Sequence, residues 1–153
     1  MSMHIDGKKI TAMYWAGQKI REAWYEGQRV FSGKPVEVMP AVSGEYDARD
    51  WLRAKLTEYG EDYQTVEEIP FEIDSSQATT MREMFYGCSS LTTVPAMDTS
   101  QVTDMRTMFY GCSSLTDGNV RLIGKRTGVS TVRMIQDSGL TREPFYDSSG
   151  QPI

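Results

Sequence analysis

A twelve-residue string occurs twice in this chain of 153 residues and limits its fold more than any other feature. "MREMFYGCSSLT" begins at Met81, and "MRTMFYGCSSLT" begins 24 residues later at Met105, with eleven of the twelve letters identical. Extending the alignment backwards pairs Asp74 with Asp98. Self-similarity at a period of about 20–50 residues indicates units that stack and share one core, because a single unit cannot bury its own apolar face.

The same period continues more weakly on both sides of the two good copies, at Val66, Leu91, Leu115 and Leu140. We count two good copies, one eroded copy and a terminal half-copy. The spacing of Leu91, Val94 and Ala96 is typical of the short strand of a leucine-rich repeat. Prolines lie within three of these predicted strands and cannot donate to a ladder, so each strand ends at its proline or the chain bends there.

The second half of each unit carries a regular apolar pattern. Met81, Met84, Phe85 and Cys88 follow an i, i+3, i+4, i+7 spacing, which predicts one face of a short helix in the core, stopped near Gly87. Cys88 and Cys112 occupy the same place in the two copies. A disulfide between them and two buried free thiols are both open interpretations.

Residues 46–60 predict an amphipathic helix before the first unit. Ala48, Leu52 and Leu56 form its apolar stripe, Asp47 is a suitable N-cap, and Gly60 ends it. We expect this helix to cover the exposed end of the first unit, as terminal capping elements do. Trp51 lies beside the stripe, and we favour a place in the core over one at an interface.

The first thirty residues carry a different repeat. Glycines recur every ten residues, at 7, 17 and 27, between β-branched and aromatic runs, which predicts a small antiparallel β-meander. Both faces of that sheet would carry large aromatics: Tyr14 and Trp24 on one, Trp15 and Tyr25 on the other. We expect a partner protein or a second copy of the chain to cover one face. The alternative is that "SGKPVEVMPAVSG" folds back over it.

The predicted fold class is therefore α+β, a short leucine-rich-repeat-like solenoid with an N-terminal capping helix, preceded by a small antiparallel β-meander. Residues 1–34 would be the meander, which anchors the protein, and 35–45 a linker. Residues 46–147 would be the solenoid, and 148–153 a tail.

The composition argues against several functional classes. The net charge is −5 and no block of Lys or Arg exists, which disfavours nucleic acid as a partner. No apolar run is long enough for membrane insertion, and "MSMHIDGKKI" lacks the apolar stretch of a secretory signal, so we expect synthesis in a cytoplasm. With a single histidine, His4, and no phosphate-binding loop, we predict no enzyme, no catalytic residue, no metal and no cofactor.

Arginine and tyrosine recur on the opposite side of the apolar pattern. If the Met and Phe side chains face inward, Arg82 and Tyr86 face outward, and Arg106 and Tyr110 repeat them. These residue types are enriched at binding hot spots, so the four predict a surface stripe for a partner. The alternative, which we prefer, is that each arginine lies over its own tyrosine.

The string "MFYGCSSLT" followed by "VPAMDTSQVTDM" resembles the BspA-like leucine-rich-repeat family, including the variant of mycoplasma surface lipoproteins, over residues 66–145. The resemblance implies a binding or adhesion module without catalytic residues. The glycine-punctuated N-terminal segment is similar to the N-terminal segments of bacteriophage virion proteins. Together they imply a virion accessory protein, a minor tail component or capsid decoration, with other virion proteins, further copies of itself and a host-surface component as partners. The alternative is a bacterial cell-surface adhesin.

Overall fold

The computed structural model describes residues 34–153 throughout and, before them, only the backbone of six short strands. The chain divides into two compact units, Met1–Pro35 and Val36–Ile153, which are treated separately below.

The first unit contains three antiparallel strand pairs. β1 (Met3–Ile5) pairs with β2 (Lys8–Ile10), β3 (Tyr14–Trp15) with β4 (Gln18–Lys19), and β5 (Glu22–Tyr25) with β6 (Gln28–Ser32). Each pair is a sheet of its own. The prediction of one continuous meander is therefore wrong. The spacing of glycines between β-branched and aromatic runs predicts local strand pairs, but it specifies no pairing from one strand pair to the next.

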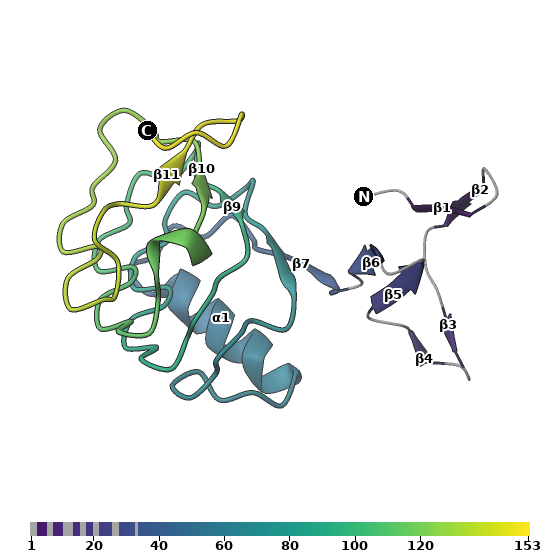
Figure 1. The fold of residues 1–153 in the computed structure, drawn as a ribbon. Coiled ribbons are helices and arrows are strands. Elements are labelled where there is room, and N and C mark those ends of the chain that lie inside the picture. Colours follow the sequence, from purple (N-terminus) through teal and green to yellow (C-terminus); the bar gives the residue numbers. More distant parts are fainter. Residues whose placement is uncertain are drawn as a thin grey trace. The chain divides into compact units, whose positions relative to one another are not determined.

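The second unit begins with a strand and contains one α-helix. β7 (Val36–Val38) lies in parallel beside β8 (Glu72–Asp74), and α1 spans Asp47–Glu58 (Figure 1). The helix predicted for 46–60 is thus present, and its stripe is fully buried at Ala48, Leu52 and Leu56. Its N-cap is Tyr46, which makes no side-chain cap hydrogen bond; the Asp47 carboxylate instead accepts from the Gly44 N–H at 2.8 Å.

The remaining strands form a second parallel sheet. β10 (Leu122–Ile123) lies between β9 (Met97–Asp98) and β11 (Phe145–Tyr146), and a 3-10 turn at Asp117–Asn119 precedes β10. β8 and β9 belong to different sheets. This part of the chain thus has one α-helix and two small parallel sheets, and the prediction of a leucine-rich-repeat solenoid is wrong.

The prolines account for much of this difference. β8, β9 and β11 begin one or two residues after Pro70, Pro95 and Pro144. The segments that matched the leucine-rich strand pattern run across the prolines, and their part before the proline forms no regular strand: an isolated bridge joins Glu68 to Thr93. A proline lacks the N–H that a ladder needs, so regular pairing starts only beyond it. This leaves strands of two or three residues in place of longer ones.

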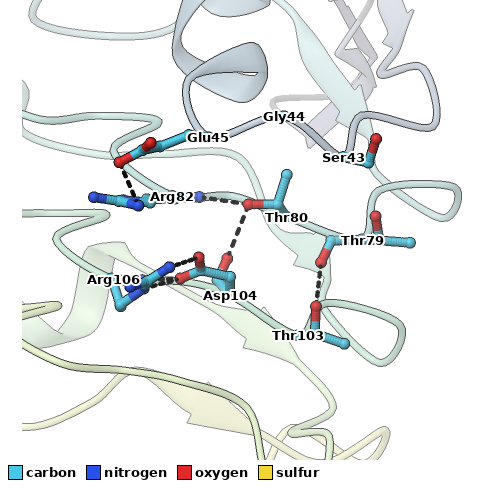
Figure 2. Close-up of a pocket in the computed structure, with 9 residues that line it drawn as sticks. All are labelled: Ser43, Gly44, Glu45, Thr79, Thr80, Arg82, Thr103, Asp104 and Arg106. Atoms are coloured by element: carbon cyan, nitrogen blue, oxygen red, sulfur yellow. Dashed lines mark hydrogen bonds and ion pairs between the residues drawn. The ribbon is translucent and has the colours of Figure 1, made fainter.

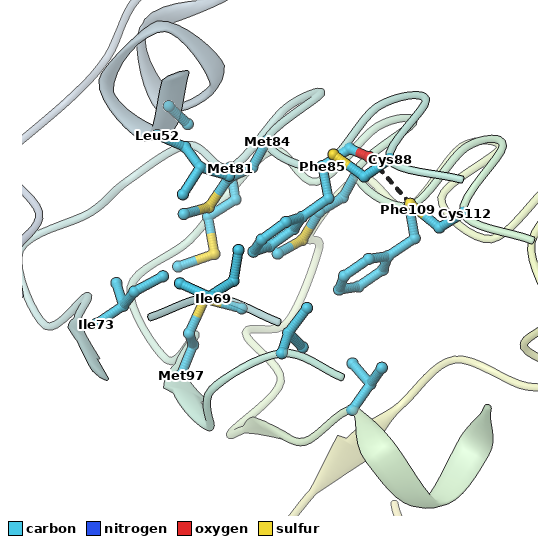
Figure 3. Packing of buried hydrophobic residues seen from close by; sticks show 14 of the residues in the cluster. Leu52, Ile69, Ile73, Met81, Met84, Phe85, Cys88, Met97, Phe109 and Cys112 are labelled. Carbon is cyan, nitrogen blue, oxygen red and sulfur yellow. Dashed lines mark hydrogen bonds between the residues drawn. The ribbon is translucent and has the colours of Figure 1, made fainter. Parts of the chain in front are cut away.

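The two copies of the repeated string nevertheless lie directly against each other. The Phe85 and Phe109 rings stack with centroids 5.4 Å apart and planes 8° apart (Figure 3). The string forms turns and not the predicted helix, with positive φ at Glu83 and Gly87 (+56° and +75°). The reason is the backbone hydrogen bonding: N–H groups that a helix would use internally donate to the next copy, as from Phe85 to the Met108 carbonyl at 3.0 Å.

The apolar pattern is buried as predicted even though the helix is absent. Met81, Met84 and Phe85 have no exposed surface, and Trp51 packs edge-on against Phe71 with centroids 6.3 Å apart. Both cysteines are free and buried, and Cys112 Sγ lies 2.9 Å from the Phe85 carbonyl oxygen, so the thiol donates between the two copies (Figure 3). The cysteines therefore behave as small core residues.

Tyr63 closes the outer side of the first copy. Its buried hydroxyl lies 3.0 Å from the Met84 carbonyl oxygen, 3.1 Å from that of Tyr86 and 3.3 Å from that of Glu83. The Glu83 carbonyl also accepts from the Tyr86 N–H, whereas Tyr63 is the donor to the Met84 and Tyr86 carbonyls. Burial raises the pKa of Tyr63, which keeps the hydroxyl protonated and able to donate.

Replacing Tyr63 with Phe should therefore destabilise the protein. We expect a loss of about 1–3 kcal/mol in the free energy of unfolding, because buried carbonyls lose their donor. Urea unfolding monitored by circular dichroism measures the loss. Tyr59→Phe is the matched control, since its hydroxyl donates to the Glu37 carboxylate at 2.7 Å in a less buried place. An equal loss in both variants would contradict a special role for Tyr63.

Candidate binding surface

The two arginines predicted to form a surface stripe are engaged by carboxylates. Arg82 is ion-paired with Glu45 at 2.5 Å and lies over the Tyr46 ring at 5.7 Å. Arg106 is ion-paired with Asp104 at 2.6 Å. Neither cation–π contact that we preferred, each arginine over the tyrosine of its own copy, occurs among the described contacts. Arg106 lowers the pKa of the Asp104 carboxyl against the opposing effect of burial.

The two tyrosines of the predicted stripe lie ring on ring. The Tyr86 and Tyr110 centroids are 5.1 Å apart with planes 8° apart, and Tyr86 is 40% exposed. Tyr110 also donates a hydrogen bond to Asp137, which raises the pKa of Tyr110. The hydrogen bond from the Gly87 N–H to the Tyr110 carbonyl, 2.8 Å long, holds the backbone of the pair together.

An open pocket of ≈ 460 Å³ lies beside the arginines and not beside the tyrosines. Its polar lining is shared by the loop before α1 and by both copies (Figure 2): Ser43, Gly44, Glu45, Thr79, Thr80, Arg82, Thr103, Asp104 and Arg106. Most of the lining side chains bind one another or backbone. The Thr79 hydroxyl donates to the Val42 carbonyl at 2.7 Å, and the Thr103 hydroxyl donates to the Thr79 carbonyl at 3.1 Å. The pocket is thus a polar groove whose cations already have partners.

The four aromatic residues predicted to dock the N-terminal sheet lie on two strands. Tyr14 and Trp15 form β3, where they pair with Lys19 and Gln18. Trp24 and Tyr25 end β5 and pair with residues of β6. Their side chains lie outside the described part of the structure, so the docking of this sheet stays a prediction.

The sequence analysis identified neither Glu45 as the partner of Arg82 nor Asp137 as the partner of Tyr110. Glu45 and Tyr46 lie outside the repeat, just before α1, and no periodic signal could connect them with Arg82. Asp137 lies in the eroded third copy, where the aligned residue of the good copies is glycine: Gly87, Gly111 and Asp137 all have positive φ. A structural alignment of that copy would have placed Asp137 next to Tyr110.

The thiols are held in their protonated form. Burial raises the pKa of Cys88 from its usual 9.0 to about 11, and burial also raises the pKa of Cys112. A thiol is a nucleophile only when it is deprotonated, so neither cysteine is activated.

Stability should fall as the pH rises above 9 for this reason. The folded protein keeps the Cys88 proton where the unfolded chain releases it, so this contribution is complete below pH 9 and is lost as the pH rises through about 11. The shift corresponds to about 2–3 kcal/mol. Urea unfolding at a series of pH values from neutral to strongly alkaline measures the fall. In Cys88→Ala the decline should be shallower, and an identical decline would contradict this origin.

No three His, Cys, Asp or Glu side chains gather into a metal site in the described structure. Of the helices described, none has the length and apolar character that crossing a bilayer requires.

Comparison with known proteins assigns a family to part of the chain. No curated protein and no solved structure matches the chain. One family model matches residues 55–137, just over half of the chain, and its description reads "Mycoplasma protein of unknown function, DUF285". The matched segment holds the end of α1, both good copies and most of the third copy. The chain therefore belongs to the DUF285 family.

Proposed function

We propose that the protein is a non-enzymatic accessory structural protein of a bacteriophage particle, a minor tail component or capsid decoration. Residues 1–34 attach it to other virion proteins or to further copies of itself. The unit Val36–Ile153 is displayed and binds a protein or a component of the host surface.

The observation that carries the binding role is the stacked pair Tyr86 and Tyr110. Two tyrosines offer a rigid aromatic surface, since each ring restricts the other and the backbone beneath them is hydrogen-bonded between copies. A preorganised surface loses little conformational entropy when a partner binds. Tyrosine is also among the residue types that dominate binding energy at interfaces.

The state of the thiols supports a role without catalysis. Cys88 and Cys112 are the nucleophiles that the repeat places together, and both are buried and protonated. Their positions are accounted for by packing between the copies.

Binding is tested with a Tyr86→Ala/Tyr110→Ala variant on purified particles. We expect adsorption to host cells to fall by about tenfold or more, because each hot-spot tyrosine contributes about 1–2 kcal/mol. Tyr46→Ala is the matched control, since Tyr46 is also 40% exposed but lies outside the stacked pair. Unchanged adsorption in the double variant would remove this surface from the proposal.

Location is tested by mass spectrometry of purified particles. We expect the protein among the particle components, and we expect deletion of residues 1–34 to abolish its incorporation while the second unit stays folded. A truncated protein that still assembles would show that the anchor is elsewhere.

A bacterial cell-surface adhesin is the second candidate, and the match to a family named for mycoplasma proteins favours it. Fractionation of the producing cells separates the two. Recovery with the cell envelope, together with absence from particles, would favour the adhesin.

A further inference from the structure

Along Met81–Gly87 and Met105–Gly111, the backbone hydrogen bonds between the copies run in one direction. In the first copy the N–H groups of alternate residues donate to carbonyls of the second copy, and the N–H groups of the second copy donate in the same way to the third. The donors of the second copy are Met105, Thr107, Phe109 and Gly111, with N···O distances of 2.8–3.1 Å. Each copy therefore presents carbonyls on one side and N–H groups on the other.

The third copy has the same backbone but no successor. Its bridge from Ser130 to Asp104 and its positive φ at Arg133 and Asp137 align it with the other two. The corresponding N–H groups belong to Thr131, Arg133, Ile135 and Asp137. Within residues 34–153 none of these four makes a hydrogen bond. We call this segment, Thr131–Asp137, the open edge.

Positive charge without an ion-pair partner lies on the open edge and on the segment just before it. Residues 120–136 contain four basic residues and no acidic one, in a chain whose net charge is −5. Arg126 and Arg133 are exposed and form no ion pair in the described structure. The two carboxylates nearby are already bound: Glu143 accepts from Lys125 and Thr131, and Asp137 accepts from Tyr110.

Apolar surface lies between these charges. Val132 is 61% exposed, and Ile135, which takes the place of Phe85 and Phe109 in the third copy, is half-buried. The edge thus offers a row of N–H donors, the Arg133 cation and two aliphatic side chains, and Arg126 precedes it by five residues in the chain.

We propose that the open edge binds an acidic segment of a partner protein. Carboxylate and carbonyl oxygens of that segment accept from the N–H row, its acidic side chains pair with Arg126 and Arg133, and its small aliphatic side chains cover Val132 and Ile135. Convergent backbone N–H groups favour anionic oxygen, and the two arginines add charge complementarity. This inference rests on the proposed function only in treating the chain as a binding module.

A second copy of the chain is a poorer occupant. The N–H row needs a row of free carbonyls, and the second and third copies already use theirs for the copy before them. On the outer side of the first copy, the Met84 and Tyr86 carbonyls already accept from the Tyr63 hydroxyl. None of the three copies thus presents a complete row of free carbonyls within residues 34–153.

Amide hydrogen exchange on the free protein tests the geometry. We expect the N–H groups of Thr131, Arg133, Ile135 and Asp137 to be protected less than about tenfold. Those of Thr107, Phe109 and Gly111 should be protected at least about a hundredfold. Comparable protection of the two sets would overturn the proposal, because the row would then already have acceptors.

Binding is tested by NMR titration with a synthetic peptide of about twelve alternating Asp and Val residues. We expect chemical-shift changes centred on the open edge that weaken several-fold between about 50 mM and about 500 mM salt. A peptide of alternating Lys and Val should produce none. Shifts centred on the Arg82 pocket, equal binding of both peptides, or no binding would each overturn the proposal.

Glycine substitutions at equivalent positions of the third and second copies, Arg133 and Thr107, test the role of the open edge. Arg133→Gly removes the charge and suits the local φ of +54°, so the fold should be retained. Combined with Arg126→Ala, this substitution should weaken the binding of the Asp–Val peptide at least fivefold. Thr107→Gly is the matched control, since Thr107 has φ +53° at the same place in the second copy and its N–H is already bonded. Equal weakening by both variants would contradict the assignment.

The outcomes separate this inference from the proposed function. If particles lack the protein but the Asp–Val peptide still binds at the open edge, the proposed function is wrong and the edge assignment holds. If the tyrosine variant loses adsorption while the peptide fails to bind, the reverse follows.

Discussion

Replacing Phe109 with Ala should cost about 3–5 kcal/mol of unfolding free energy, which is a large part of the total stability of a domain this size. The Phe109 side chain is fully buried, and truncation leaves a cavity in the interior that the copies share. The stacked contact with Phe85 is lost as well, which adds to the cost of the cavity. Urea unfolding monitored by tryptophan fluorescence and by circular dichroism measures the change.

Tyr110→Ala is the matched control for this variant. Tyr110 is the next residue and also stacks on its counterpart in the first copy, but it lies on the outer side and is only half-buried. We expect it to cost about 1 kcal/mol or less, as for a partly exposed side chain. If Phe109→Ala cost no more than Tyr110→Ala, the shared interior of the copies would be wrong.

Replacing Gly139 with Ala should destabilise the protein by about 3 kcal/mol or more. A Cβ at this position would lie 2.0 Å from the Leu115 carbonyl oxygen and 2.8 Å from that of Ser113. Both atoms are backbone, so no side chain can rotate away. The chain would have to separate from the second copy, which also breaks the hydrogen bond from the Gly139 N–H to the Cys112 carbonyl.

Gly118→Ala provides the control for the glycine prediction. No heavy atom lies within 4 Å of a Cβ added at Gly118, and its φ is not in the left-handed region. We expect a change within about 0.5 kcal/mol of the wild type. Thermal unfolding of both variants makes the comparison, and similar melting temperatures would contradict the close approach at Gly139.

Some of the fold could be predicted because it depends on local patterns. The stripe of Ala48, Leu52 and Leu56 predicted α1, since an amphipathic helix needs only its own spacing and a surface to cover. Asp74 and Asp98, which the sequence alignment pairs, form the same local turn, and the carboxylate of each accepts from the N–H two residues later.

The architecture could not be predicted because its decisive interactions are not local. Met81, Met84 and Phe85 fit a helical face, yet the N–H groups of alternate residues bond to the next copy and leave turns in place of a helix. The leucine-rich strand pattern was misleading for a related reason, since β8 takes β7 as its partner from outside the repeat. Periodicity shows that copies are equivalent, but it does not show which backbone groups they share.

Only the part of the candidate binding surface that follows from the repeat could be predicted. The period alone implied that Tyr86 and Tyr110 are neighbours, and the rings are stacked. The pairing of Arg82 with Glu45 joins the repeat to the segment before α1, and the sequence holds no signal for it.

The central claim is that the two copies of the repeated string share one interior, with Phe85 directly over Phe109. The chain has only five phenylalanines, so nuclear Overhauser spectra of a sample with labelled phenylalanine rings can be assigned by single substitution. With ring centroids 5.4 Å apart, strong cross-peaks between the Phe85 and Phe109 rings are expected, and they should disappear in Phe109→Leu. Spectra of the folded protein without a Phe85–Phe109 cross-peak would contradict the account.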